Sequence, residues 1–150
     1  MKVVVTGASG FIGTYVLTEL NKKDVEIIAI SRTQKNNTLL KLQNVNWINL
    51  DIAKPPKDCF NFIGRPDCLI NLAWEGLPNY RSDHHINKEL PSQYNFLSNL
   101  IYDGLDSLIS VGTCFEYGMQ SGELSVNHST NPDNEYAIAR PSVQKINGIY

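Results

Sequence analysis

Five short runs of β-branched and apolar residues recur along the chain, and longer stretches of mixed polarity separate them. Short apolar runs of this kind are typical of buried β-strands. The strands are therefore predicted over residues 3–6, 25–30, 45–50, 68–72 and 107–111.

Two of the separating stretches place apolar residues at helical spacing. One spans residues 11–20 and the other residues 82–102, and each is predicted to be a helix with an apolar stripe that packs on the sheet. A short helix is expected after the prolines of residues 51–62, and another over residues 134–140, where Pro141 is expected to interrupt it.

Alternating strands and helices favour a parallel sheet, because parallel neighbours need a connection that returns across one face of the sheet. The predicted fold class is α/β, a doubly wound parallel sheet of the Rossmann type with strand order 3-2-1-4-5. A length of 150 residues is typical of one domain, so residues 1–150 are predicted to form a single unit.

Composition and charge exclude several classes of function. Hydrophobic residues make up 42% and charged residues 19%, which is an ordinary globular mixture. A net charge of -2 without a basic stripe argues against nucleic acid or an anionic membrane as partner. No leader is expected, because the residues after Met1 lack the apolar stretch of a signal peptide, and no later run reaches membrane-spanning length. Cys59, Cys68 and Cys114 are expected to be free thiols, so a cytoplasmic location is predicted. No zinc-type spacing is present, so no metal is expected, and His84 and His85 are expected to be exposed to solvent without a role.

A glycine-rich segment, T-G-A-S-G-F-I-G at residues 6–13, lies between the first predicted strand and the first predicted helix. Gly7 permits a tight turn, Gly10 allows the backbone to approach a pyrophosphate, and Gly13 allows close packing of helix and strand. The amide groups at the helix start then favour an anion. Dinucleotide binding by Gly7, Ser9, Gly10, Phe11, Ile12 and Gly13 is predicted. A turn without a ligand is the alternative.

The end of the second predicted strand bears on the choice of cofactor. An acidic residue there would accept the ribose hydroxyls of NAD, whereas this sequence has Ser31 and Arg32. Because an arginine can pair with a 2′-phosphate, NADP is predicted, with NAD still possible. A solvated surface arginine is the alternative interpretation. Asp51 is expected either to bond the adenine or to cap the next turn.

The order of several motifs resembles a known family. They are T-G-A-S-G-F-I-G at residues 6–13, Asp51-Ile52, Asn71-Leu72-Ala73-Trp74, T-C-F-E-Y-G at residues 113–118, and Tyr136. This order resembles the extended short-chain dehydrogenase/reductases, also called NAD-dependent epimerase/dehydratases, in their nucleotide-sugar branch. Within that branch, the runs at residues 74–80 and 112–120 resemble bacterial proteins of the dTDP-6-deoxy-L-talose 4-dehydrogenase type.

The resemblance implies roles for particular residues. Ile52, Leu72, Ala73 and Trp74 are expected to join the cofactor site. Thr113 is expected to hydrogen-bond a substrate carbonyl or hydroxyl, and Tyr136 to exchange a proton with it, because a carbonyl that accepts hydride develops negative charge. A strand-end threonine and a loop tyrosine without a catalytic role are the alternative. A tyrosine with an ordinary pKa of about 10 needs a nearby cation for this task. The family has a lysine at that position, and this sequence has Arg140.

The implied activity is hydride transfer at C4 of a nucleotide sugar of the dTDP-6-deoxyhexose type, by a reductase, dehydrogenase or epimerase. The resemblance also implies a further substrate domain that this sequence lacks, so a truncated and inactive form is one expectation. A dinucleotide-binding regulatory module and a non-functional remnant are the alternatives. An exposed sheet edge makes a homodimer a further prediction.

Overall fold

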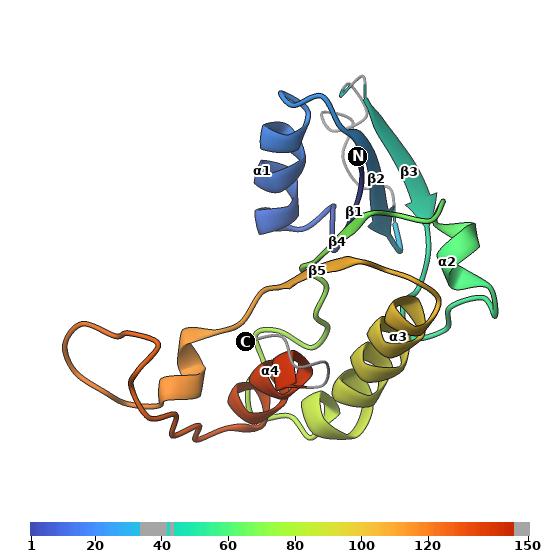
Figure 1. Ribbon diagram of the computed structural model, residues 1–150. Coiled ribbons are helices and arrows are strands. Elements are labelled where there is room, and N and C mark those ends of the chain that lie inside the picture. Colours follow the sequence, from blue (N-terminus) through green and yellow to red (C-terminus); the bar gives the residue numbers. More distant parts are fainter. Residues whose placement is uncertain (34–41, 43, 146–150) are drawn as a thin grey trace. The chain divides into compact units, whose positions relative to one another are not determined.

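The computed structural model describes residues 1–33, 42 and 44–145 (Figure 1). It divides into two compact units. The first consists of Met1–Ala73 and Phe96–Val111, and the second of Trp74–Asn95 and Gly112–Tyr150. No helix in the described part of the chain has the length and apolar character needed to cross a membrane.

The first unit contains one parallel five-stranded sheet. Its strands are β1 (Lys2–Thr6), β2 (Glu26–Ser31), β3 (Val45–Asn49), β4 (Cys68–Asn71) and β5 (Ser107–Ser110). The order across the sheet is β3-β2-β1-β4-β5, with Val4 of the central strand in register with Ile28 on one side and Leu69 on the other. The predicted fold class and strand order are confirmed.

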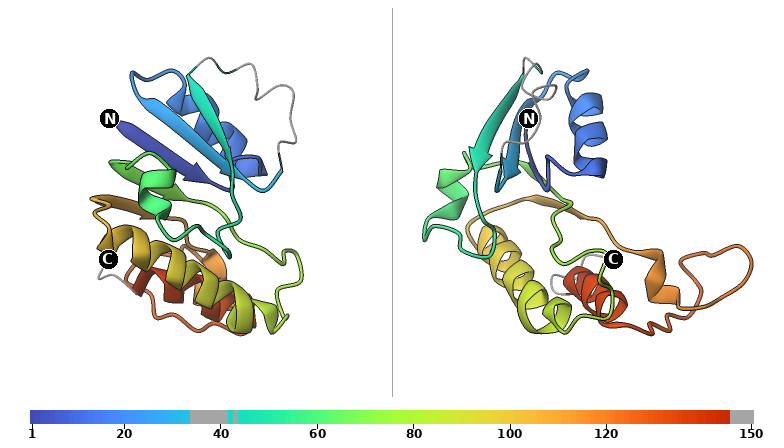
Figure 2. Two further views of the ribbon diagram at one scale, coloured as in Figure 1. Left: turned by 90° about the vertical axis from the view of Figure 1, so that its right-hand side faces the viewer. Right: turned by 180° about the vertical axis from the view of Figure 1, so that it is seen from behind.

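The helices of the first unit lie on both faces of this sheet. Figure 2 shows α1 (Phe11–Leu20) on one face and the short α2 (Cys59–Phe62) on the other. A third helix, α3 (Leu90–Tyr102), begins in the second unit and ends in the first. The helix expected after the prolines of residues 51–62 is therefore present as α2.

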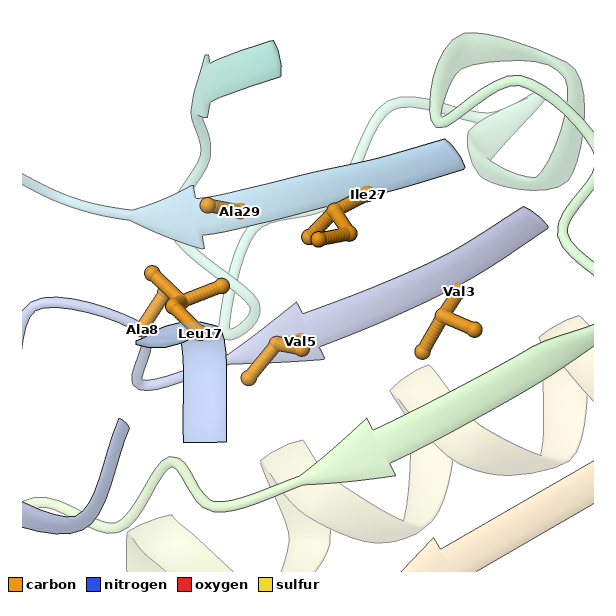
Figure 3. Close-up of a cluster of buried hydrophobic side chains, with 6 residues drawn as sticks. All are labelled: Val3, Val5, Ala8, Leu17, Ile27 and Ala29. Carbon is orange, nitrogen blue, oxygen red and sulfur yellow. The ribbon is translucent and has the colours of Figure 1, made fainter. Parts of the chain in front are cut away.

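The core of the first unit explains why its strands are nearly continuous apolar runs, since a parallel sheet that is covered on both faces buries successive side chains. Three consecutive valines of β1, at residues 3–5, are at most 2% exposed. Figure 3 shows one cluster gathered between β1, β2 and α1, formed by Val3, Val5, Ala8, Leu17, Ile27 and Ala29.

The second unit consists of short helices joined by loops. A π-helical segment, η2 (His85–Glu89), leads into α3, and a 3-10 turn, η3 (Cys114–Tyr117), follows β5 along the chain. The last helix, α4 (Glu135–Lys145), packs against both η2 and η3.

The expected interruption of the last helix at Pro141 is wrong, because α4 continues to Lys145 with this proline in its interior. Proline removes one helical hydrogen bond, here the one that the carbonyl of Ala137 would accept. The helix persists because its start is capped by the Asn134 side chain, which accepts a hydrogen bond from the amide of Ala137 at 2.9 Å. Its buried face continues beyond the proline, where Val143 is 1% exposed.

Candidate functional site

The glycine loop has the conformation that its sequence predicts. Gly7 follows β1 with a φ of +64°, and the amide of Gly10 donates to the carbonyl of Gly7 at 2.9 Å. A Cβ atom on Gly7 would lie 2.8 Å from the amide nitrogen of Ala73, and one on Gly13 would collide with the carbonyl oxygen of Gly7. The loop therefore brings backbone amides close together at the start of α1, which is the arrangement that binds pyrophosphate in strand-turn-helix sites.

The last residue of β1 ties this loop to the end of β4. The hydroxyl of Thr6, which is fully buried, donates to Oδ1 of Asn71 at 2.6 Å and accepts from the amides of Leu72 and Ala73 at 3.2 and 3.3 Å. The carboxyl ends of the central strands are where open α/β sheets bind ligands. The structure thus brings Leu72 and Ala73 to the glycine loop, and their contact with the cofactor stays a prediction.

The sequence interpretation missed Thr6 and Asn71 as parts of this site. The available signal was a polar residue at the end of each of two otherwise apolar strands.

Ser9 and Ser31 connect the loop to the end of β2. Their hydroxyl oxygens lie 2.7 Å apart, and the Ser31 hydroxyl also contacts the carbonyl of Thr33 at 2.7 Å. Arg32 follows directly and is exposed. The structure therefore connects Ser31 to the glycine loop and places Arg32 directly after it in the chain.

Asp51 caps the turn that follows β3, because its Oδ1 accepts from the amide of Ala53 at 3.0 Å. The Asp51 side chain thus caps this turn, and its contact with adenine stays a prediction. Its neighbour Ile52 is half-buried, as Asp51 is.

In the second unit, Tyr136 of α4 is only 8% exposed and lies among aromatic rings. Its amide donates to the carbonyl of Tyr80 at 3.0 Å, which fixes the start of the helix. Ring-centroid distances from Tyr136 are 5.4 Å to His85, 5.5 Å to Tyr80, 5.8 Å to Trp74 and 6.2 Å to Phe115. These contacts restrict the phenol ring to a narrow range of orientations.

Arg140 lies one helical turn after Tyr136 and is 3% exposed. Its guanidinium carbon lies 4.8 Å from the centroid of the Trp74 ring, a cation-π geometry. Burial lowers the pKa of Arg140, while the nearby Tyr136 and Glu89 act in the opposite direction. A guanidinium remains protonated in proteins, so Arg140 supplies a buried positive charge beside Tyr136.

Thr113 occupies the position before η3, where its hydroxyl oxygen accepts from the amide of Phe115 at 3.3 Å. Phe115 in turn contacts the ring of Tyr136. The structure thus brings Trp74 into contact with both Tyr136 and Arg140 and links Thr113 to Tyr136 through Phe115.

The expected solvent exposure of His85 is wrong, since this side chain is 0% exposed. The indole Nε1 of Trp74 donates to Nδ1 of His85 at 3.1 Å, and Nε2 of His85 lies 2.9 Å from the carbonyl oxygen of Asn79. An indole nitrogen can only donate and a carbonyl can only accept, so His85 is neutral with its proton on Nε2. The sequence shows no sign of these contacts, because Trp74 and Asn79 do not follow the spacing of a helix or a strand that includes His85.

His84 is half-buried, with its Nε2 4.0 Å from a carboxylate oxygen of Glu75 and 3.9 Å from one of Glu89. Oε1 of Glu89 also accepts from the side-chain Nε2 of Gln93 at 2.9 Å. The ligand atoms of Glu75, His84 and Glu89 all lie within 4.8 Å of one another, a grouping that the sequence interpretation missed.

A hollow of about 370 Å³ opens beside the ring pair of Tyr80 and Phe115, whose centroids are 4.9 Å apart. Arg81 and Asp133 line it and are joined by an ion pair of 3.5 Å. Both of these aromatic rings also contact the ring of Tyr136.

Comparison with known proteins shows which sequences this chain is similar to. The model of the NAD dependent epimerase/dehydratase family matches residues 3–148. A dTDP-6-deoxy-L-talose 4-dehydrogenase (NAD(+)) of Aggregatibacter actinomycetemcomitans is 30% identical over 141 residues, covering 93% of this chain and 52% of that protein. A dTDP-4-dehydro-6-deoxyglucose reductase of Escherichia coli is 26% identical over 151 residues, covering 92% and 47%.

Solved structures agree on the fold. The UDP-glucuronic acid 4-epimerase of Bacillus cereus in complex with NAD has a TM-score of 0.79 at 22% identity, over 97% of this chain and 51% of that chain. The chain thus spans about half the length of the relatives that it matches.

Proposed function

Because this chain belongs to the NAD dependent epimerase/dehydratase family, we propose that it is the dinucleotide-binding part of an enzyme that transfers hydride at C4 of a nucleotide sugar. The observation that best supports this proposal is the buried cation of Arg140 beside the phenol of Tyr136. A positive charge held next to a phenol serves proton exchange with a substrate oxygen.

The residues of the first unit fit a dinucleotide. Gly7 and Gly13 are enclosed so closely by backbone that a Cβ atom would not fit, and α1 begins directly after Gly10. The amides of this loop would hold the pyrophosphate, with Leu72 and Ala73 beside it. When bound, the nicotinamide would supply or accept the hydride.

In the second unit, Thr113 and Tyr136 would act on the sugar oxygen. The Thr113 hydroxyl would donate a hydrogen bond to the oxygen at C4, and the Tyr136 phenol would give its proton to that oxygen in reduction or take it in oxidation. Arg140 would stabilise the negative charge that remains on the phenol oxygen after the proton leaves.

The cofactor is proposed to be NADP, on the basis of Arg32 and the absence of an acidic side chain at Ser31. NAD is the second candidate, because the printed name of the 30% identical relative specifies NAD(+). That name also supports a sugar of the dTDP-6-deoxyhexose type as substrate.

The compartment and the partners of the chain are also proposed. The three free cysteines are consistent with a reducing, cytoplasmic compartment. A homodimer is also proposed, and nucleic acid and membrane are not expected partners for a chain of net charge -2 without a basic stripe.

Calorimetric titration of the purified chain with NADPH and with NADH, beside a reductase assay with a dTDP-6-deoxy-4-keto-hexose, tests the proposal. We expect binding and turnover, with Tyr136→Phe binding the cofactor normally but losing turnover. Binding without turnover in the wild type would favour a truncated, inactive form of the enzyme or the dinucleotide-binding regulatory module. No binding of either cofactor would leave only the non-functional remnant.

A further inference from the structure

The position that holds a lysine in the resembled family is Arg140 in this chain, and the two cations differ in shape. A guanidinium is planar and stacks on aromatic faces, whereas an ammonium is a compact point charge. The Arg140 guanidinium carbon lies 4.8 Å from the centroid of the Trp74 ring. An arginine at this position therefore has a partner surface that suits its shape.

Trp74 is itself held in place. Its Nε1 donates to Nδ1 of His85 at 3.1 Å, and His85 in turn contacts the carbonyl of Asn79 at 2.9 Å. The His85 side chain that connects the two bonds is 0% exposed. The plane of the indole is thus fixed by hydrogen bonds that run from the backbone of Asn79 through the buried His85.

The same indole also touches the phenol. The ring centroids of Trp74 and Tyr136 are 5.8 Å apart with an interplanar angle of 75°, and His85 contacts the Tyr136 ring at 5.4 Å. One side chain therefore contacts both Tyr136 and Arg140, which lie a single helical turn apart on α4.

We infer that Trp74 is a positioning residue that orients the Arg140 guanidinium relative to Tyr136, and that Trp74 and Arg140 form a matched pair. His85 supports this role by fixing the indole. The catalytic consequence rests on the proposed function, because it requires Tyr136 to exchange a proton with substrate.

Kinetic coupling tests the inference on the full chain. We expect Trp74→Leu to lower kcat on the order of tenfold, as loss of a desolvated cation-π contact would, with KM for the sugar changed less than about twofold. Trp74→Phe keeps an aromatic face and should restore most of kcat. In wild type, Arg140→Lys should lower kcat by about tenfold, but in the Trp74→Leu background it should lower kcat by less than about twofold.

Trp47→Leu is the matched control, since Trp47 of β3 is the other tryptophan of the chain and packs on the core of the first unit. It should lower thermal stability and leave kcat unchanged. Independent effects of Trp74→Leu and Arg140→Lys that multiply in the double variant would overturn the inference. An equal loss of kcat in Trp47→Leu, or no recovery in Trp74→Phe, would also overturn it.

A second readout does not depend on turnover. In a Trp47→Phe background, Trp74 is the sole tryptophan, so its fluorescence reports on the guanidinium at its face. Arg140→Met should change the emission, whereas Arg81→Met, a matched change at an exposed arginine of the same unit, should not. If Arg140→Met leaves the emission unchanged, the inference about Trp74 is overturned and the proposed function is not. If the emission changes but the wild type shows no turnover, only the proposed function is overturned.

Discussion

The glycines of the loop after β1 and of the first turn of α1 differ in how closely the backbone encloses them. A Cβ on Gly13 would collide with the carbonyl oxygen of Gly7 and lie 2.7 Å from that of Ala8, whereas one on Gly10 would lie 3.1 Å from the Gly7 oxygen. Backbone atoms of a sheet-helix connection cannot move aside without disturbing both elements. The two positions should therefore respond very differently to a single methyl group.

We expect Gly13→Ala to lower the free energy of unfolding by about 2 kcal/mol or more, because overpacking against fixed atoms is costly. Gly10→Ala should change it by less than about 1 kcal/mol but weaken cofactor binding, since its methyl group points into the space proposed for the pyrophosphate. Urea denaturation and calorimetric titration measure the two effects. Wild-type stability in Gly13→Ala would contradict the described loop geometry.

The cysteines differ in reactivity for a reason that lies in their surroundings. Burial, followed by the nearby carboxylates of Asp103 and Asp58, raises the pKa of Cys59 to about 11, while Cys114 is exposed. Since the thiolate is the reactive form, iodoacetamide at pH 8 should modify Cys114 quickly and leave Cys59 unmodified in the folded chain. Peptide mapping by mass spectrometry checks this, with urea-unfolded chain as the control in which both react.

The same shift predicts a dependence of stability on pH. Because the folded pKa of Cys59 is raised from 9.0 to about 11, its contribution to stability is fully present below pH 9 and is lost as the pH rises towards 11. Cys59→Ala should flatten the decline of the melting temperature over this interval. An identical decline in that variant would assign the pH dependence to other groups.

At the scale of elements, the strands were predictable because burial on both faces of a parallel sheet leaves a continuous apolar run in the sequence. The end of α4 was not predictable from the sequence. Proline usually interrupts a helix, but here the packing of the buried face of α4 against residues distant in sequence outweighs that effect. Ala137 and Val143 lie on opposite sides of Pro141 in the sequence and are both buried. Their burial holds the helix together across the missing hydrogen bond.

Pro141→Ala should therefore stabilise the chain. It restores the hydrogen bond to the carbonyl of Ala137, and we expect a gain of about 1–3 kcal/mol in the free energy of unfolding, reduced in part by greater freedom of the unfolded chain. Ser142→Ala, on the same turn, loses only the exposed hydroxyl bond to the carbonyl of Ile138 and should change stability by less than about 0.5 kcal/mol. Urea denaturation measures the free energy of unfolding of both variants. An unchanged value in Pro141→Ala would show that the proline does not destabilise α4.

The candidate site was predictable only in part for a related reason. The glycine loop is encoded by neighbouring residues, so its turn could be derived from the sequence alone. The surroundings of Tyr136 depend on His85, whose burial results from Trp74 and Asn79 in a loop without periodicity. Such contacts leave no local pattern, and only the folded chain reveals them.

At the scale of the whole molecule, the sheet of the first unit has β5 at one end of its strand order. Ile109 of this strand is 52% exposed, and a strand edge of this kind can pair with another chain. We expect concentration-dependent association of the chain in sedimentation experiments, and Ile109→Lys should weaken it because a charge on an edge strand opposes such pairing. Tyr102→Lys, at a 91% exposed position at the end of α3, is the control that should leave association unchanged.

Cofactor binding should be visible in the stability of the whole chain. A ligand that binds only the folded state at about 100 times its Kd adds about 2.7 kcal/mol to the free energy of unfolding. For a chain of this size the melting temperature should then rise by roughly 5–10 °C. Because Arg32 is proposed to pair with the 2′-phosphate, NADPH should give a larger rise than NADH at equal concentration.

Arg32→Ala should remove the difference between the two cofactors while leaving the rise with NADH intact, since the glycine loop remains unchanged. Lys54→Ala, another exposed cation of the first unit, should preserve the preference and so controls for net charge. Thermal unfolding followed by circular dichroism measures all three proteins. A larger rise with NADH in the wild type would assign this chain to NAD, in line with its 30% identical relative, and would leave Arg32 as a surface residue.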